Sequence, residues 1–167
     1  GPCADFGCGP GHTTRFLYDA GVKDITGIDL SPSMVNVARK HFPEVKFETG
    51  DLLGLDHDDS TFSSAIAFYS IVHFDYDQIA FAFKEIYRVL RTDAQFLFSF
   101  HVGEEIVHFN EANGVSIDID LHFHQTNRVL EILRKSKFTT RDTIERLPYP
   151  DVEYETKRGY IWAQKTG

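Results

Sequence analysis

Residues 3–14 read CADFGCGPGHTT, an acidic and apolar run that enters a glycine-rich turn and continues into a helical pattern. Glycine has no Cβ atom, so glycines at alternate positions let the backbone turn tightly and come close to a ligand. The helix predicted over residues 13–20 points its free amide groups and its positive dipole end at the same place. The segment therefore predicts a ligand-binding loop that joins a buried strand to a helix.

Apolar runs alternate with helical patterns along the first part of the chain, which is typical of crossover units in a mostly parallel sheet. Beyond residue 100 the alternation loosens, and residues 139–146 and 160–164 are predicted to form an antiparallel pair. No internal repeat or low-complexity segment divides the sequence, so residues 1–167 are predicted to form one domain. The predicted strands are 3–6, 24–29, 45–48, 64–69, 95–100 and 116–123, and the predicted helices are 13–20, 32–42, 78–90 and 126–136.

The composition suits one globular domain and narrows the classes of partner. The chain has 167 residues, of which 42% are hydrophobic, and its formal net charge is −8. This charge repels a polyanionic backbone, and lysine and arginine are scattered, so we expect no nucleic-acid partner. The sequence has no signal peptide and no long apolar run, so we expect no membrane partner and a cytoplasmic location. On an extended chain, Cys3 and Cys8 lie too far apart to form a disulfide.

Several motifs carry a resemblance to a known family. The segment DFGCGPG at residues 5–11 resembles motif I of the class I S-adenosylmethionine-dependent methyltransferases. IDLSPSM at residues 28–34 resembles the second motif of that family, and FYSIVHF at residues 68–74 resembles its fourth-strand segment. The helix that ends with residues 85–90 is similar to the one before the family's K-P-G-G turn. Here that turn, RTDAQ at residues 91–95, lacks both proline and glycine.

The resemblance implies a Rossmann-like α/β fold. In this fold a seven-stranded, mostly parallel sheet has an antiparallel C-terminal strand, and helices cover both faces. Because the sequence begins inside a strand, the resemblance also implies one or two preceding helices, so that 1–167 is an N-terminally incomplete methyltransferase domain. It further implies S-adenosylmethionine as the cofactor, S-adenosylhomocysteine as the product, and a monomer or homodimer.

Three acidic residues, Asp5, Asp29 and Asp51, each lie at the carboxyl end of successive predicted strands, where open α/β sheets build their sites. The resemblance implies that Asp5 favours the ammonium group of the cofactor through charge or a bridging water. It implies that Asp29 accepts both ribose hydroxyls, and that Asp51 with the amide of Leu52 reads the adenine edge.

The remaining cofactor contacts are also implied by the resemblance. The glycine loop wraps the amino-acid end of the cofactor, Leu30 and Met34 pack on one adenine face, and Leu53 closes the other. The full implied cofactor-binding set is Asp5, Gly7, Cys8, Gly9, Asp29, Leu30, Met34, Asp51, Leu52, Leu53, Tyr69 and Ser70. A dinucleotide-binding domain is the nearest rival. It requires G-x-G-x-x-G, whereas this chain has Gly7-x-Gly9-x-Gly11 and a second acid, Asp51, that has no role there.

Methyl transfer from a sulfonium is an in-line displacement that needs alignment and exclusion of water. Tyr69, Ser70 and His73 are expected at the end of the fourth strand, facing the methyl group. His73 and Tyr69 are the candidate catalytic residues, with His73 as a general base, and its alternative role is to hydrogen-bond and position the loop. Residues 68–71 contain neither the N/D-P-P-Y motif nor the Pro-Cys nucleophile of nucleic-acid methyltransferases, so a small molecule is the predicted acceptor. A non-catalytic S-adenosylmethionine-binding sensor or partner subunit stays open as the alternative.

Two further groups of residues have competing interpretations. His101, His108, His122 and His124 do not show the spacing of a zinc site, so no metal is predicted. Arg158 either binds a carboxylate of the substrate or pairs with Glu153 or Glu155.

Overall fold

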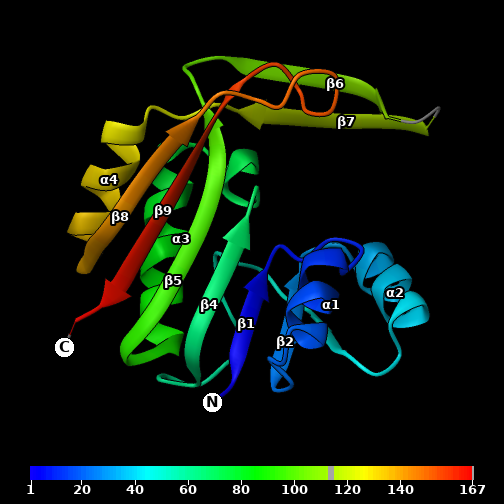
Figure 1. The fold of residues 1–167 in the computed structure, drawn as a ribbon, viewed down its shortest axis with the longest axis vertical. Coiled ribbons are helices and arrows are strands. Elements are labelled where there is room, and N and C mark those ends of the chain that lie inside the picture. Colours follow the sequence, from blue (N-terminus) through cyan, green and yellow to red (C-terminus); the bar gives the residue numbers. More distant parts are fainter. Residues whose placement is uncertain (113–114, 167) are drawn as a thin grey trace.

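The strands of the main sheet follow the order β3-β2-β1-β4-β5-β9-β8 in the computed structural model, which describes residues 1–112 and 115–166 (Figure 1). Neighbouring strands are parallel from β3 to β5, and β9 is antiparallel to both β5 and β8. This order and the single reversed strand confirm the predicted fold class. The elements of the main sheet and its helices are β1 (Cys3–Phe6), α1 (His12–Asp19), β2 (Ile25–Asp29), α2 (Pro32–His41), β3 (Lys46–Thr49), β4 (Phe62–Phe68), η1 (Ile71–His73), α3 (Tyr76–Val89), β5 (Leu90–Val102), α4 (Thr126–Lys135), β8 (Phe138–Arg146) and β9 (Lys157–Lys165).

Local sequence signals fix the ends of the first helices. Ser31 caps α2, because its hydroxyl accepts the amide of Met34 and Pro32 occupies the first helical position. Gly21 follows α1 with a φ of 112°, and its amide donates to the carbonyl of Tyr18 at 3.1 Å. These signals explain why the predicted bounds of α1 and α2 agree with the structure to within about one residue.

The fifth strand and a later hairpin differ from the sequence prediction. The fifth strand begins at Leu90 directly after α3, whereas the sequence predicted a turn over residues 91–95 and a strand from residue 95. Asp93 has a φ of 66°, so a single left-handed residue bends the chain without the proline and glycine expected there. The sequence analysis also missed β6 (Ile106–Ala112), which pairs with β7 (Val115–His122) as a separate antiparallel hairpin.

The core divides into two clusters, one on each face of the sheet. The larger cluster is rich in phenylalanine and packs under α3 and α4, and α3 lies behind β5 in Figure 1. The smaller cluster joins Val35 and Ala38 of α2 to Ile25 and Phe47 of the first strands. Burying a large apolar side chain stabilises the fold by about 1.5–3 kcal/mol, so this aromatic layer is a main source of stability. Its fully buried phenylalanines are Phe6, Phe83, Phe96, Phe98 and Phe100.

The carboxyl ends of β1, β2, β3 and β4 meet at one edge of the sheet because these strands are parallel. The β6–β7 hairpin lies beyond this edge, across the top of the molecule in Figure 1, while the N-terminus lies at the opposite edge. The edge therefore gathers the loops that follow four strands. No helix in the described parts of the chain is long and apolar enough to cross a membrane.

Candidate functional site

The glycine loop after β1 needs glycine for two different reasons. Gly7 and Gly11 have φ angles of 71° and 87°, and a Cβ on Gly7 would lie 2.3 Å from the Cβ of Ser70. A Cβ on Gly11 would lie 2.7 Å from the ring of Phe47. Gly9, with a φ of 51°, has no heavy atom within 4 Å of its Cβ position, so it opens on free space. The loop is thus tightly packed on one side and open at Gly9, where a ligand can approach the backbone.

Asp29 at the end of β2 holds this loop in place. Its Oδ2 accepts the amide of Gly9 at 2.8 Å, and its Oδ1 accepts the amide of Ser31 at 2.9 Å. The side chain is half-buried, and each carboxylate oxygen keeps a second acceptor site. Asp29 can therefore order the loop and still accept hydroxyl donors from a ligand.

Asp5 is buried rather than open to the surface. The hydroxyl of Thr14 in α1 donates to its Oδ2 at 2.6 Å. Burial, against the hydrogen bond from Thr14 and with a smaller contribution from the charge of Asp29, raises the pKa of Asp5 to about 6. Asp5 therefore acts on the loop through charge and through Thr14, and its contribution to ammonium binding stays a prediction.

The predicted adenine side presents apolar side chains to solvent. Leu30 is 65% exposed and Met34 is 43% exposed, just beyond Asp29. Asp51 is exposed after β3, and its carboxylate accepts the amide of Leu53 at 2.8 Å. The side chain of Leu52 belongs to the core, and Leu53 packs partly against it. The structure thus places an exposed apolar pair and an exposed carboxylate at the same sheet edge, and their contact with adenine stays a prediction.

The end of β4 places two more predicted residues beside the loop. Tyr69 has a φ of 55°, and its amide donates to the carbonyl of Ser99 at 3.1 Å. The buried hydroxyl of Ser70, which adjoins Gly7, has no hydrogen-bond partner within residues 1–112 and 115–166. A strained residue and an unpaired buried hydroxyl at a strand end are features of binding sites.

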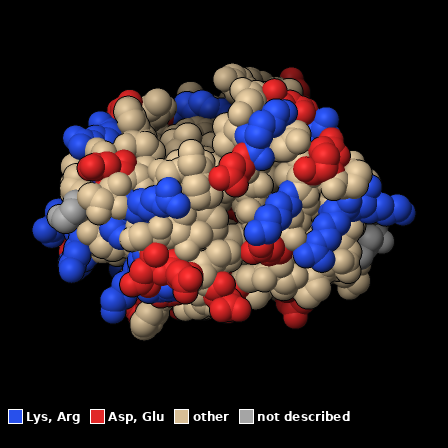
Figure 2. Space-filling model, turned by 90° about the horizontal axis from the view of Figure 1, so that it is seen from below, with Lys and Arg blue, Asp and Glu red and all other residues tan. Residues whose placement is uncertain are grey.

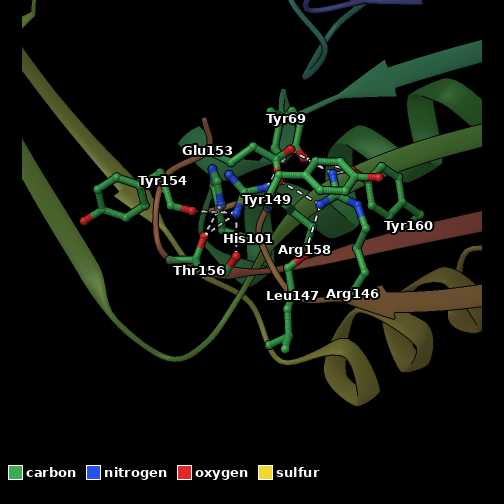
Figure 3. A network of polar contacts seen from close by, with 10 residues as sticks. All are labelled: Tyr69, His101, Arg146, Leu147, Tyr149, Glu153, Tyr154, Thr156, Arg158 and Tyr160. Atoms are coloured by element: carbon green, nitrogen blue, oxygen red, sulfur yellow. Dashed lines mark hydrogen bonds and ion pairs between the residues drawn. The ribbon is translucent and has the colours of Figure 1, made fainter. Parts of the chain in front are cut away.

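The phenol of Tyr69 belongs to a polar cluster (Figure 3). Its hydroxyl lies 3.2 Å from that of Tyr160, and its ring lies 5.0 Å from the ring of His101. Burial and the Tyr160 hydrogen bond raise the pKa of Tyr69 to about 12, so the phenol keeps its proton at neutral pH. Tyr69 is therefore suited to donating a hydrogen bond rather than to accepting a proton.

His73 lies on η1, just beyond Tyr69 and Ser70, and its side chain is exposed. Its pKa is lowered from the ordinary value, first because surrounding protein atoms desolvate it and also because His122 adds like charge. The negative charge of Asp29 opposes this shift by raising the pKa, so His73 lies close enough to Asp29 for the two side chains to interact electrostatically. A neutral imidazole is the form that can accept a proton.

Arg146 was not singled out by the sequence analysis, which considered Glu153 only as a partner of Arg158. Arg146 donates to both carboxylate oxygens of Glu153 at 2.7 Å and to the hydroxyl of Tyr160 at 2.9 Å. The Nε of Arg158 lies 3.4 Å from Glu153, so the ion pair with Glu153 is confirmed. The sequence signal that could have drawn attention to Arg146 is the predicted pairing of residues 139–146 with the last strand. In the register of that pairing, Arg146 lies opposite Arg158.

The histidines weighed as metal ligands lie in other roles. The buried His124 contacts the carbonyl of Ile71 at 3.1 Å, and burial lowers its pKa to about 4. His101 contacts the hydroxyl of Thr156 at 2.6 Å, and His108 pairs with Asp120 at 2.9 Å. The described residues contain no group of three His, Cys, Asp or Glu side chains that could hold a metal ion. Both cysteines are buried free thiols.

A cavity of about 990 Å³ lies elsewhere, along the outer face of α3 and α4. Its lining includes Leu53, Tyr76, Phe81 and Arg128, but not the glycine loop or Asp29. We therefore assign the candidate site to the carboxyl edge of the sheet, where the unusual backbone, the anchoring carboxylate and the exposed apolar pair converge.

The sheet order and the site at this edge define a Rossmann-like α/β domain of the class I methyltransferase type. A family model described as a methyltransferase domain matches residues 4–93, which is more than half of the chain. The chain belongs to this methyltransferase family, whose class I members use S-adenosylmethionine as the cofactor.

Individual relatives that are named methyltransferases match parts of the chain. The trans-aconitate 2-methyltransferase of Sinorhizobium medicae is 43% identical over 54 residues, which are 31% of this chain and 21% of that protein. An uncharacterised methyltransferase of Bacillus subtilis is 31% identical over 106 residues, which are 60% of this chain and 41% of that protein. The chain thus spans less than half the length of these two curated relatives.

A solved structure shows the same fold over almost the whole chain. The S-adenosylmethionine-dependent methyltransferase from Methanosarcina mazei has a TM-score of 0.87 and 17% identity, and the likeness covers 99% of this chain and 92% of that one. At this identity the likeness concerns the fold alone.

The residues present fit S-adenosylmethionine. Gly9 opens on free space beside the carboxylate of Asp29, and the exposed Leu30 and Met34 offer an apolar surface for a planar base. The unpaired Ser70 hydroxyl lies against Gly7, where a polar ligand atom can satisfy it.

Proposed function

We propose that this domain transfers a methyl group from S-adenosylmethionine to the oxygen, nitrogen or carbon of a small-molecule acceptor by in-line displacement. The observation that carries the proposal is the pair of hydrogen bonds by which Asp29 holds the glycine loop and the start of α2. These bonds order the loop through contacts within the protein itself, so ligand binding needs little further ordering. The family membership given above supports the same reaction class.

The protein's part in the reaction is to bind, align and exclude water. When bound, S-adenosylmethionine supplies a methyl group that its sulfonium already activates. Asp29 accepts the ribose hydroxyls, Leu30 and Met34 cover the adenine, and the open backbone at Gly9 receives the amino-acid end. Tyr69 donates a hydrogen bond to the acceptor, and neutral His73 removes the acceptor's proton where the reaction requires it.

A small acceptor is supported by charge and by the relatives. Lysine and arginine lie interspersed with aspartate and glutamate on the face shown in Figure 2, without a basic stripe, and the net charge is −8. The relative from Sinorhizobium medicae is named for a small organic acid, trans-aconitate. We further propose a monomer or homodimer in the cytoplasm, without nucleic-acid or membrane partners. Sedimentation of the purified chain tests the oligomeric state.

Calorimetric titration with S-adenosylmethionine, S-adenosylhomocysteine and NAD tests the proposal first. Binding of the two sulfur ligands without NAD binding is the expected result, and NAD binding alone would overturn it. Turnover with a panel of small acceptors and cell extract then separates an enzyme from a binding module. Donor binding without transfer to any acceptor or extract component would favour a sensor or partner subunit.

A further inference from the structure

Two arginines share one carboxylate beside Tyr69. Arg146 forms a two-pronged pair with Glu153, and the Nε of Arg158 approaches the same carboxylate at 3.4 Å. The side chains of Arg146, Arg158 and Glu153 together therefore carry one net positive charge, within a chain whose net charge is −8. Such a local excess of positive charge attracts an anion.

Arg158 is only 4% exposed, although it carries a permanent charge. Its Nη1 donates to the carbonyls of Tyr154, at 2.6 Å, and of Thr156. Its Nε is buried and has no hydrogen-bond partner in the described parts of the chain. Glu153 meets this nitrogen as an ion pair at 3.4 Å without forming a hydrogen bond, so an acceptor oxygen placed closer to Nε would stabilise the buried charge.

This arginine pair lies in one polar network with Tyr69, a predicted catalytic residue (Figure 3). The hydroxyl of Tyr160 accepts from Arg146 at 2.9 Å and meets the hydroxyl of Tyr69 at 3.2 Å. A group held by the two arginines would therefore lie within the same polar cluster as Tyr69, which ends β4. The segment that carries Glu153, residues 147–156, connects β8 to β9 and contributes Tyr149, Tyr154 and Thr156 to the network in Figure 3.

We propose that Arg146 and Arg158 form a subsite for a carboxylate group of the methyl acceptor, in which Glu153 occupies the place of that carboxylate until the acceptor binds. This inference rests on the proposed function, and it narrows the class of methyl acceptor to carboxylic acids. A carboxylate fits because it is planar and presents two oxygens, which matches the fork that Arg146 already offers to Glu153. Glu153 can leave because its pair with Arg146 lies near the surface, with side-chain exposures of 21% and 27%. Glu153 also accepts the amide of Tyr149 at 2.7 Å, so it competes with an incoming acid for the two arginines, and removing its charge should strengthen binding of that acid.

Acetate and acetamide are the probes that test this subsite, because they are nearly equal in size and differ in charge. The readout is the ¹⁵N–¹H resonances of the arginine Nε groups during titration at constant ionic strength, in protein saturated with S-adenosylhomocysteine. In the Glu153→Gln variant, the competing carboxylate is gone, so acetate should bind about fivefold more tightly than to the unaltered protein. Acetamide should give no saturable shift in either protein.

Glu155→Gln is the matched control, because it removes the same charge from the same segment and Glu155 is exposed. Its acetate affinity should equal that of the unaltered protein. In the double variant Glu153→Gln with Arg146→Gln, the gain in acetate binding should be lost. The subsite is overturned if Glu153→Gln leaves acetate affinity unchanged, or if both Gln variants raise it equally, since that would reflect net charge alone.

Calorimetry with S-adenosylhomocysteine on the same samples keeps this test apart from the proposed function. A protein that binds S-adenosylhomocysteine without the acetate response contradicts only the carboxylate subsite. A protein that fails to bind S-adenosylhomocysteine contradicts the cofactor site. The carboxylate subsite is then tested by titrating acetate into protein without S-adenosylhomocysteine.

Discussion

The carboxylate of Asp29 accepts the amide of Gly9 at 2.8 Å, although the two residues are 20 positions apart in the sequence. This bond joins the end of β2 to the loop after β1, so the predicted ribose contact and the predicted loop form one unit. The second oxygen of Asp29 extends the unit to Ser31, which caps α2. A change at Asp29 therefore affects both the ligand contact and the shape of the loop.

Replacing Asp29 with alanine should weaken S-adenosylmethionine binding by about 2–3 kcal/mol, the scale of a lost charge-assisted hydrogen-bonded partner. Calorimetry measures this loss directly. Asp56→Ala, an exposed acid after β3, is the control and should leave the affinity unchanged. Unchanged affinity in Asp29→Ala would place the ribose site elsewhere.

Replacing Gly7 with alanine should destabilise the domain, because the residue has a φ of 71° and its Cβ would meet Ser70 at 2.3 Å. Left-handed backbone and overpacking together cost about 2–4 kcal/mol. Chemical denaturation checks this, with Gly54→Ala as the control because a Cβ there meets no atom within 4 Å. Combining Gly7→Ala with Ser70→Gly should recover the part of the loss that is due to crowding. If the double variant recovers nothing, backbone strain alone is responsible.

Asp5→Asn should change the pH dependence of stability. The folded protein raises the pKa of Asp5 from 3.8 to about 6, so its protonated form is favoured by folding. The resulting stability is complete below pH 3.8 and is lost as the pH rises through 6, by up to about 3 kcal/mol. Asparagine has no such loss, so the variant should exceed the unaltered protein in free energy of unfolding at pH 7.5 and match it near pH 3.5.

The same Asp5→Asn variant should bind S-adenosylmethionine more weakly, because the negative charge that favours the ammonium group is gone. Calorimetry at pH 7.5 and thermal unfolding between pH 3.5 and 7.5 together check both effects. Equal donor affinity in the two proteins would assign Asp5 to stability alone, through Thr14.

His73→Ala should lower kcat and leave donor affinity nearly unchanged, because His73 is placed on the acceptor side. The pKa of His73 lies below its ordinary value, so the unaltered enzyme should gain rate as the pH rises through that lowered pKa. The variant should lack this step in its pH–rate profile, whereas His41→Ala, an exposed residue at the end of α2, should retain it. A profile that is identical in His73→Ala would leave His73 as a positioning residue.

Much of the fold followed from local signals in the sequence. The glycine loop, the cap at Ser31 and the apolar spacing of α3 predicted elements that the structure confirms, because these signals act between neighbouring residues. The long β5 was predicted too short, because Asp93 adopts a left-handed conformation that is uncommon for a residue other than glycine. The strand β6 was missed because its pairing with β7, rather than its own pattern, makes it a strand.

The sequence by itself determined the family and the glycine loop. The loop joins a strand to a helix directly along the chain, so its conformation depends mainly on neighbouring residues and can be predicted from them. The tertiary structure alone decided that Ser70 meets Gly7, and that Tyr69, Tyr160 and Arg146 form one cluster. The contact of Ser70 with Gly7 depends on the pairing of β4 with β1, and the cluster depends on the register of β9 against β5 and β8; register is set by the packing of the whole sheet. Tyr69, Tyr160 and Arg146 became neighbours because β9 enters the sheet between β5 and β8.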